Sequence, residues 1–202
     1  MKKHQFLRYG LLRRFRRGVR LSIALTYRCN LNCSYCSTKI ATGKTPTAKE
    51  VSWHELVSFV SRFPYPIREI RLTGGAPELH KYFVGFVNWL LDKGYFVQVI
   101  TNLLFYDKLN KLKRTPRLMF CATYHHEMGV IEKIEWFANY GRLKENYRII
   151  VDEIDYQVLP SISRLKPFLT KEVMKSNDNM LRVGPDLEIY LNCFNRHANK
   201  HI

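Results

Sequence analysis

Three features of this chain of 202 residues predict an α/β fold built on a parallel sheet. Short apolar runs rich in β-branched residues alternate with stretches of helical periodicity, at least four times along the chain. Right-handed crossovers between successive strands would make the sheet parallel. The repeats number about six, whereas a closed eight-unit barrel usually needs about 250 residues. We therefore predict a partial (β/α)6 barrel with a parallel sheet. It would resemble a TIM barrel that does not close.

The predicted strands are short, and each ends at a turn signal or a polar motif. The first, residues 19–26 (VRLSIALT), is an apolar run that stops at a cysteine-rich loop. The second, residues 67–75 (IREIRLTGG), stops at a glycine pair. The remaining predicted strands are 95–102, 117–124, 147–153 and 187–193. Residues 175–179 (KSNDN) are expected to form a loop before the last strand.

The predicted helices are marked by capping signals and apolar stripes. Ser52 and Glu55 have the spacing of a capping box, and they open a helix with apolar residues at Trp53, Leu56, Val57 and Val60. Gly94 is expected to close the next helix, whose stripe is Leu79, Phe83, Phe86, Val87 and Leu90. Two further helices are expected over residues 105–113 and 127–140. Gly141 is expected to end the last of them.

The composition indicates one core domain with a basic N-terminal arm. The chain is 46% hydrophobic and 13% aromatic, which argues against general disorder. Its formal net charge is +16, and residues 1–20 contain eight cations and no acids. We predict an arm over 1–18 and a core domain over 19–202. The charge favours an anionic substrate or partner, with nucleic acid among the candidates. No membrane span or signal peptide is seen, so a cytoplasmic location is expected.

Three of the five cysteines lie in RCNLNCSYC (28–36), directly after the first predicted strand. Thiolates within one short loop can converge on a soft metal centre, and these are Cys29, Cys33 and Cys36. A cubane iron–sulfur cluster takes four cysteines for full ligation, so three leave one iron open. Alternatives stay open: a structural zinc site completed by His54 or Cys193, a redox pair of Cys33 and Cys36, or buried inert cysteines.

The stretch TYRCNLNCSYCST (26–38) resembles the signature loop of the radical S-adenosylmethionine (radical SAM) superfamily, C-x-x-x-C-x-aromatic-C. Cys29, Cys33, Tyr35 and Cys36 hold the matching positions, and GGAPEL (74–79) is similar to the Gly-Gly-Glu-Pro motif of that family. The resemblance implies a [4Fe-4S] cluster on the three cysteines and SAM bound to the open iron. It also implies reductive cleavage of SAM to a 5′-deoxyadenosyl radical that abstracts hydrogen from a substrate.

The resemblance further implies that residues at the other strand ends take part in the site. The implied cofactor-binding residues are Tyr35, Gly74, Gly75, Ala76, Pro77, Thr101, Asn102 and Thr123, and the implied catalytic residue is His125. Ala76 stands where the family usually has a glutamate that binds the SAM amino group, and Glu78 is a candidate to replace it. Parallel-sheet enzymes place their sites at the carboxyl ends of strands, which is where these motifs fall.

The expected function is that of a radical SAM enzyme acting on a small-molecule or nucleotide substrate. The positive charge favours a nucleotide or a nucleic-acid base, including a modified base of viral DNA. The alternative substrates are a peptide or a glycyl-radical enzyme that needs activation. A zinc-stabilised nucleic-acid-binding module is the alternative from another class. An electron donor such as flavodoxin or ferredoxin is the expected protein partner.

Overall fold

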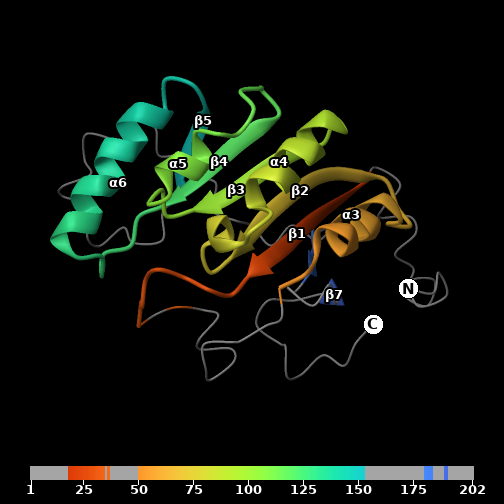
Figure 1. Cartoon of the computed structure of the whole chain (residues 1–202), viewed down its shortest axis with the longest axis horizontal. Helices are drawn as coiled ribbons and strands as arrows, with labels where there is room; N and C mark the ends of the chain where they lie inside the picture. Colours follow the sequence, from red (N-terminus) through yellow and green to blue (C-terminus); the bar gives the residue numbers. More distant parts are fainter. Residues whose placement is uncertain (1–17, 35, 37–49, 153–179, 184–188, 191–202) are drawn as a thin grey trace.

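The computed structural model describes residues 18–34, 36, 50–152, 180–183 and 189–190 (Figure 1). Their strands form one seven-stranded sheet in the order β5-β4-β3-β2-β1-β6-β7. The strands are β1 Val19–Thr26, β2 Ile67–Gly74, β3 Phe96–Thr101, β4 Leu118–Thr123, β5 Arg148–Asp152, β6 Met180–Val183 and β7 Ile189–Tyr190. Predictions for the arm up to residue 17, for Tyr35, for the 175–179 loop and for Cys193 concern residues outside this description.

The sheet confirms the predicted α/β fold class. Every neighbouring pair from β5 across to β6 is parallel, and the β6–β7 pair at the edge is antiparallel. The sixth strand in chain order differs from the prediction, because it is Met180–Val183 and it pairs with β1. The predicted strand 187–193 appears as the two-residue strand β7. A run of four residues is too short to show a period, and tertiary packing decides which edge it joins.

The helices cover the sheet in the predicted order. They are α3 Trp53–Ser61, the 3-10 helix η2 Pro77–Leu79, α4 Phe83–Asp92, α5 Tyr106–Leu109 and α6 Val130–Leu143. Figure 1 shows α3 and α4 beside β1 to β3, and α6 at the β4–β5 end. The capping box is confirmed, since the Ser52 hydroxyl accepts from the Glu55 N–H at 3.3 Å and the Ser52 N–H donates to Glu55 Oε2 at 2.8 Å.

Several predicted helix boundaries are wrong. The helix predicted over 105–113 ends at Leu109, and Leu79 of the predicted stripe lies in η2 instead of α4. Gly94 does follow α4 in the left-handed region, with φ +83°. Gly141, however, lies inside α6, which continues to the fully buried Leu143. The same helix begins at Val130, after the N-cap Gly129, instead of at Glu127. Burial of its last turn therefore overrides the local glycine signal.

Alternation along the strands gives the sheet an apolar face and a polar face. On the apolar face, Leu21, Ile23, Ile70 and Leu72 are fully buried in a cluster with Phe86 of α4. Burying one such side chain contributes about 1.5–3 kcal/mol. This cluster holds the parallel strands together, so that their carboxyl ends meet at one edge of the sheet.

The other face of the sheet carries charged and amide side chains at alternate positions. Arg20 of β1 lies 3.2 Å from Glu69 of β2, between Nε and Oε2. Arg71 of β2 donates to the side-chain oxygen of Gln98 on β3. In a partial barrel this face lines the interior, so the interior beneath the strand ends is polar. None of the helices in the described ranges has the length and apolar character needed to cross a membrane.

Candidate functional site

The cysteine loop follows β1 and carries three thiols. Cys29 is exposed, Cys33 is buried and Cys36 is partly buried. Desolvation raises the pKa of the Cys29 thiol, and the charges of Cys33, Cys36 and Glu78 raise it further. The soft donor set of the three thiols fits an iron–sulfur cluster. No three His, Cys, Asp or Glu side chains in the described part of the chain converge as a metal site, so the cluster ligands stay a prediction.

The ends of β3 and β4 hold this loop by hydrogen bonds. Glu127, after β4, accepts from the Ser34 N–H at 2.6 Å and also from the Ser34 hydroxyl. Asn102, after β3, donates from Nδ2 to Asn30 Oδ1 at 2.8 Å. The structure therefore brings motifs from three strand ends together, as the strand-end argument predicts.

His125 lies beside the buried thiol of the loop. Its Nδ1 is 3.5 Å from Cys33 Sγ, and its side chain is partly buried. The neighbouring His126 has Nε2 3.8 Å from Glu127 Oε1, an ion pair only when the imidazole is protonated. Among the residues predicted to be functional, His125 thus contacts a predicted cluster ligand.

The glycine pair after β2 packs directly against the chain that enters the cysteine loop. Gly74 has φ +132°, and a Cβ there would stand 2.0 Å from the Thr26 carbonyl oxygen. A Cβ on Gly75 would stand 2.2 Å from the Arg28 carbonyl oxygen. The Gly75 and Ala76 N–H groups donate to these two carbonyls at 2.9 and 2.8 Å. Both N–H groups are used within the protein, so neither is available to a ligand.

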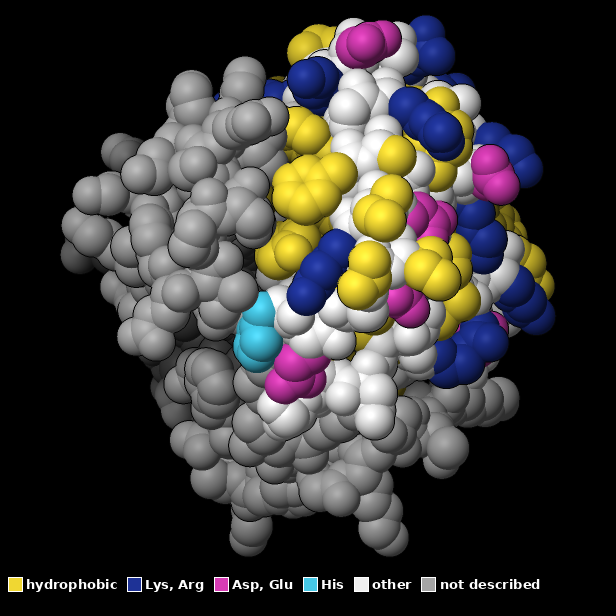
Figure 2. All heavy atoms as spheres, turned by 90° about the vertical axis from the view of Figure 1, so that its left-hand side faces the viewer, with side chains coloured by type: hydrophobic (Ala, Val, Ile, Leu, Met, Phe, Trp, Pro, Cys, Tyr) yellow, Lys and Arg dark blue, Asp and Glu magenta, His cyan; other side chains and the backbone are white. Residues whose placement is uncertain are grey.

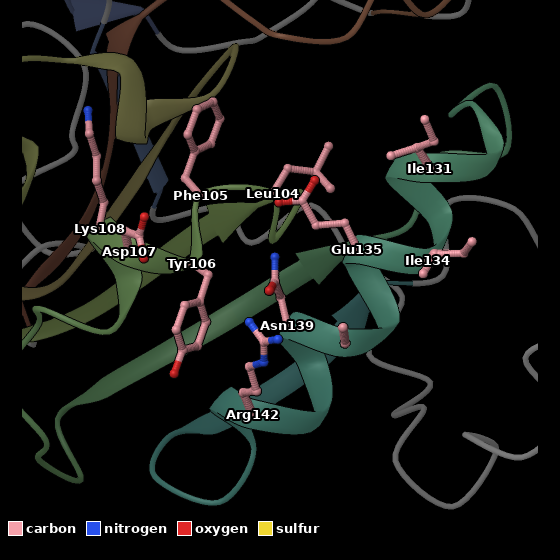
Figure 3. Close-up of a pocket in the computed structure, with 11 residues that line it drawn as sticks. Leu104, Phe105, Tyr106, Asp107, Lys108, Ile131, Ile134, Glu135, Asn139 and Arg142 are labelled. Atoms are coloured by element: carbon pink, nitrogen blue, oxygen red, sulfur yellow. The ribbon is translucent and has the colours of Figure 1, made fainter.

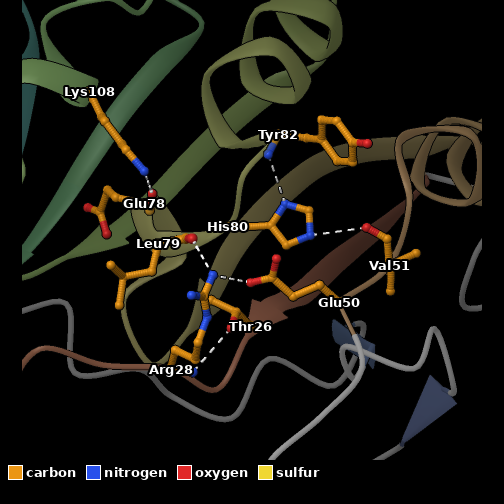
Figure 4. A network of polar contacts seen from close by, with 9 residues as sticks. All are labelled: Thr26, Arg28, Glu50, Val51, Glu78, Leu79, His80, Tyr82 and Lys108. Atoms are coloured by element: carbon orange, nitrogen blue, oxygen red, sulfur yellow. Dashed lines mark hydrogen bonds and ion pairs between the residues drawn. The ribbon is translucent and has the colours of Figure 1, made fainter.

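Arg28 connects the start of the cysteine loop to the segment after the glycine pair. Its guanidinium donates to the Leu79 carbonyl at 2.6 Å and forms an ion pair with Glu50 (Figure 4). The Arg28 N–H donates to the Thr26 hydroxyl at 3.1 Å. These contacts tie β1, η2 and the segment before α3 together.

His80 completes this network as a neutral structural residue. It is fully buried, and its Nδ1 accepts from the Tyr82 N–H at 3.3 Å. Its Nε2 therefore carries the proton and donates to the Val51 carbonyl at 3.2 Å (Figure 4). Burial lowers the pKa of the imidazole, which keeps it neutral at physiological pH.

Glu78 is a fully buried carboxyl group in η2. Neither of its oxygens has a well-formed hydrogen bond from the described residues. Burial raises its pKa from 4.5 to about 7, although the nearby Thr101 hydroxyl and the Lys108 ammonium act in the opposite direction. In Figure 4 its carboxylate points away from the network of Arg28 and His80. Burying a hydrogen-bond acceptor without a donor costs free energy. This indicates that a donor for Glu78 comes from outside the described residues.

The predicted residues at the end of β3 shape a tight turn. The Thr101 hydroxyl accepts from the Leu103 N–H at 2.9 Å, and Asn102 Oδ1 accepts from the Leu104 N–H at 3.1 Å. Leu103 is fully buried with φ 59°, and Asn139 of α6 donates to its carbonyl at 2.8 Å. A leucine in the left-handed region is strained, so these bonds hold the turn in place.

The other predicted residues occupy supporting positions. Pro77 is buried at the start of η2, and Thr123 is 4% exposed at the end of β4. The Thr123 carbonyl accepts from Trp136 Nε1 of α6 at 3.1 Å, which anchors the helix to the strand end. Cys121 is buried in β4. Sequence reasoning did not single out Asn30 or Lys108, because only the fold shows their partners.

A hollow of 670 Å³ lies next to this site, between α5 and α6 (Figure 3). Lys108 is on its wall and also donates to the Glu78 carbonyl. Ile131 and Ile134 of α6, which are 78% and 66% exposed, line its other side. Figure 2 shows hydrophobic side chains gathered on this face of the molecule. The hollow contains none of the three loop cysteines, so it is separate from the predicted cluster position.

Fold and site together define an α/β barrel-type protein with a three-cysteine loop at the carboxyl edge of a parallel sheet. Residues 23–128 match the Radical SAM superfamily, and the chain belongs to that superfamily. This membership confirms the predicted class, radical SAM enzyme, and its cofactors, a [4Fe-4S] cluster and SAM. The roles of individual residues stay predictions.

Curated relatives match part of the chain. The chain is 38% identical over 96 residues to a GTP 3′,8-cyclase of Lactiplantibacillus plantarum, a match that covers 46% of this chain and 28% of that protein. It is 38% identical over 73 residues to a GTP 3′,8-cyclase of Campylobacter jejuni subsp. doylei, covering 36% and 23%. The matched region thus spans less than a third of these relatives.

Among solved structures, the Streptococcus suis protein SuiB bound to S-adenosylmethionine is similar with a TM-score of 0.51. The two chains are 9% identical, and the match covers 92% of this chain and 61% of that one. At this identity the similarity shows a shared fold. It supports the partial-barrel prediction.

Proposed function

We propose that Cys29, Cys33 and Cys36 hold a [4Fe-4S] cluster on which the chain reductively cleaves SAM. When bound, this cofactor pair supplies an electron and a 5′-deoxyadenosyl radical that abstracts a hydrogen atom from the substrate. The observation that carries the proposal is the packing of the three-cysteine loop against the ends of β2, β3 and β4. This packing lies within the matched residues 23–128.

The residues around the loop have separate tasks in this proposal. Glu127 and Asn102 orient the loop through Ser34 and Asn30. The glycine pair lets the chain after β2 lie against the loop without a steric clash. His125 hydrogen-bonds Cys33 Sγ and is a positioning residue, since hydrogen bonds to cluster sulfurs adjust the reduction potential.

We infer an anionic substrate, with a nucleotide as the first candidate. The formal net charge is +16, and residues 1–20 contain eight cations and no acids. Guanidinium groups are well suited to bind phosphate. The relatives reported above are named for an activity on GTP. A reductant such as flavodoxin or ferredoxin would supply the electron.

Anaerobic reconstitution tests the cofactor proposal. The wild-type chain should bind iron and sulfide, absorb broadly near about 400 nm, and convert SAM to methionine and 5′-deoxyadenosine when reduced. Cys33→Ala should lose both the cluster and the cleavage. Cys121→Ala is the matched control, because Cys121 belongs to β4 and not to the cysteine loop, and it should keep both. A colourless wild-type protein that binds zinc in place of the cluster would refute the proposal.

The substrate is tested by transfer of deuterium. Deuterated nucleotides and nucleosides are incubated with the reduced, reconstituted chain, and 5′-deoxyadenosine is analysed by mass spectrometry. Enrichment from a nucleotide supports the substrate proposal. Transfer from a peptide pool alone would refute the nucleotide proposal and leave the cofactor proposal intact.

A further inference from the structure

Glu78 stands out among the buried groups because its carboxyl lacks the partners that burial normally requires. Its side chain is 0% exposed, and neither oxygen has a well-formed hydrogen bond from the described residues, although the Thr101 hydroxyl is nearby. Structural carboxylates in protein interiors are paired or hydrogen-bonded, because an unpaired buried charge is costly. In a protein that binds a cofactor, an unpaired buried carboxylate indicates that a cationic ligand is its partner.

The cations next to Glu78 are engaged elsewhere. Lys108 directs its ammonium to the Glu78 backbone carbonyl, although its charge still acts on the carboxyl. Arg28 is bound to Glu50 and to the Leu79 carbonyl. Figure 4 shows both arrangements, with the Glu78 carboxylate outside the network of dashed contacts.

Glu78 lies close to the cysteine loop, where the cofactors are proposed to bind. It lies in η2, directly after the glycine pair that packs on the cysteine loop. Its charge acts on the Cys29 thiol, and the Thr101 hydroxyl at the end of β3 is nearby. Ala76 has no polar side chain, and its N–H is used by Arg28. Glu78 is therefore the acidic side chain that this loop offers to a ligand.

We propose that the Glu78 carboxylate binds the ammonium group of SAM and so takes the place of a glutamate at position 76. This inference rests on the proposed function, since it requires SAM at the cysteine loop. The SAM ammonium carries three N–H donors and a positive charge. It would satisfy the unpartnered oxygens and neutralise the buried carboxylate in one contact.

Binding measurements on the reconstituted full-length chain test this assignment. The affinities for SAM and for 5′-deoxy-5′-methylthioadenosine, which lacks the amino-acid part, are measured anaerobically by calorimetry. The electron paramagnetic resonance signal of the reduced cluster is followed during the SAM titration. Glu78→Gln keeps the shape of the side chain, and Glu145→Gln, an exposed position after α6, is the control for the same change in charge.

Glu78→Gln should weaken SAM binding by about tenfold to a hundredfold, the range for a charge-assisted hydrogen bond, and leave the affinity for the truncated ligand unchanged. Glu145→Gln should change neither affinity. Equal SAM binding by wild type and Glu78→Gln would overturn the assignment and leave the proposed function standing. Equal loss of both ligands would show that Glu78 only shapes the loop, which also overturns it. A cluster-bearing wild type that binds no SAM would refute the proposed function itself.

Discussion

Replacing Glu78 with glutamine should stabilise the cofactor-free protein, and the gain should depend on pH. Burial raises the pKa of the carboxyl from 4.5 to about 7. Between these pH values the folded state holds a proton that the unfolded state has released, so wild-type stability falls as the pH rises. One pKa unit corresponds to about 1.4 kcal/mol, so the total loss is about 3 kcal/mol, complete once the pH exceeds about 7. Glutamine does not titrate and avoids this loss.

Urea unfolding of the reduced, cluster-free chain measures the effect. The free energy of unfolding of Glu78→Gln should exceed that of wild type by less than about 1 kcal/mol at pH 5 and by about 3 kcal/mol at pH 8. Other titrating groups are common to both proteins, so their contributions cancel in the difference. For Glu145→Gln the difference from wild type should be the same at both pH values.

Two parallel pH profiles would show that Glu78 has a partner in the folded chain, and the reasoning from its burial would then be wrong. The expected gain in folding stability is informative because the same substitution is expected to weaken SAM binding. A residue retained for structure should weaken folding when it is replaced. A residue retained for a ligand should weaken binding while folding improves.

Two further substitutions test the packing around the cysteine loop, and a third tests the course of α6. Gly75→Ala forces a Cβ to within 2.2 Å of the Arg28 carbonyl, and it should lower the melting temperature and the iron content together. Gly141→Ala has no atom within 4 Å of the new Cβ and lies inside α6, so urea unfolding should show a gain of about 1 kcal/mol. Glu127→Ala removes the acceptor of the two Ser34 donors, and it should reduce the iron retained after gel filtration while the far-ultraviolet circular dichroism is unchanged. An unstable Gly141→Ala, or a Glu127→Ala variant with full iron content, would contradict this account.

Local signals in the sequence were sufficient for the fold class and for most elements. The apolar run of β1, the capping box of α3 and Gly94 after α4 each depend on neighbouring residues, and the structure has all three. The cysteine loop is also a local pattern, so its chemistry could be inferred without a fold. Family membership confirms the predicted cofactors, a [4Fe-4S] cluster and SAM.

Only the tertiary structure decided how the site is assembled. Ser34 and Glu127 are 93 residues apart, and Asn30 and Asn102 are 72 apart, so no local pattern relates either pair. The pairing of Met180–Val183 with β1 and the burial of Glu78 are likewise properties of the packed chain. A sequence records which groups are present and at what spacing. Whether a carboxyl group loses its water and its partners depends on contacts between distant segments, and these exist only after folding.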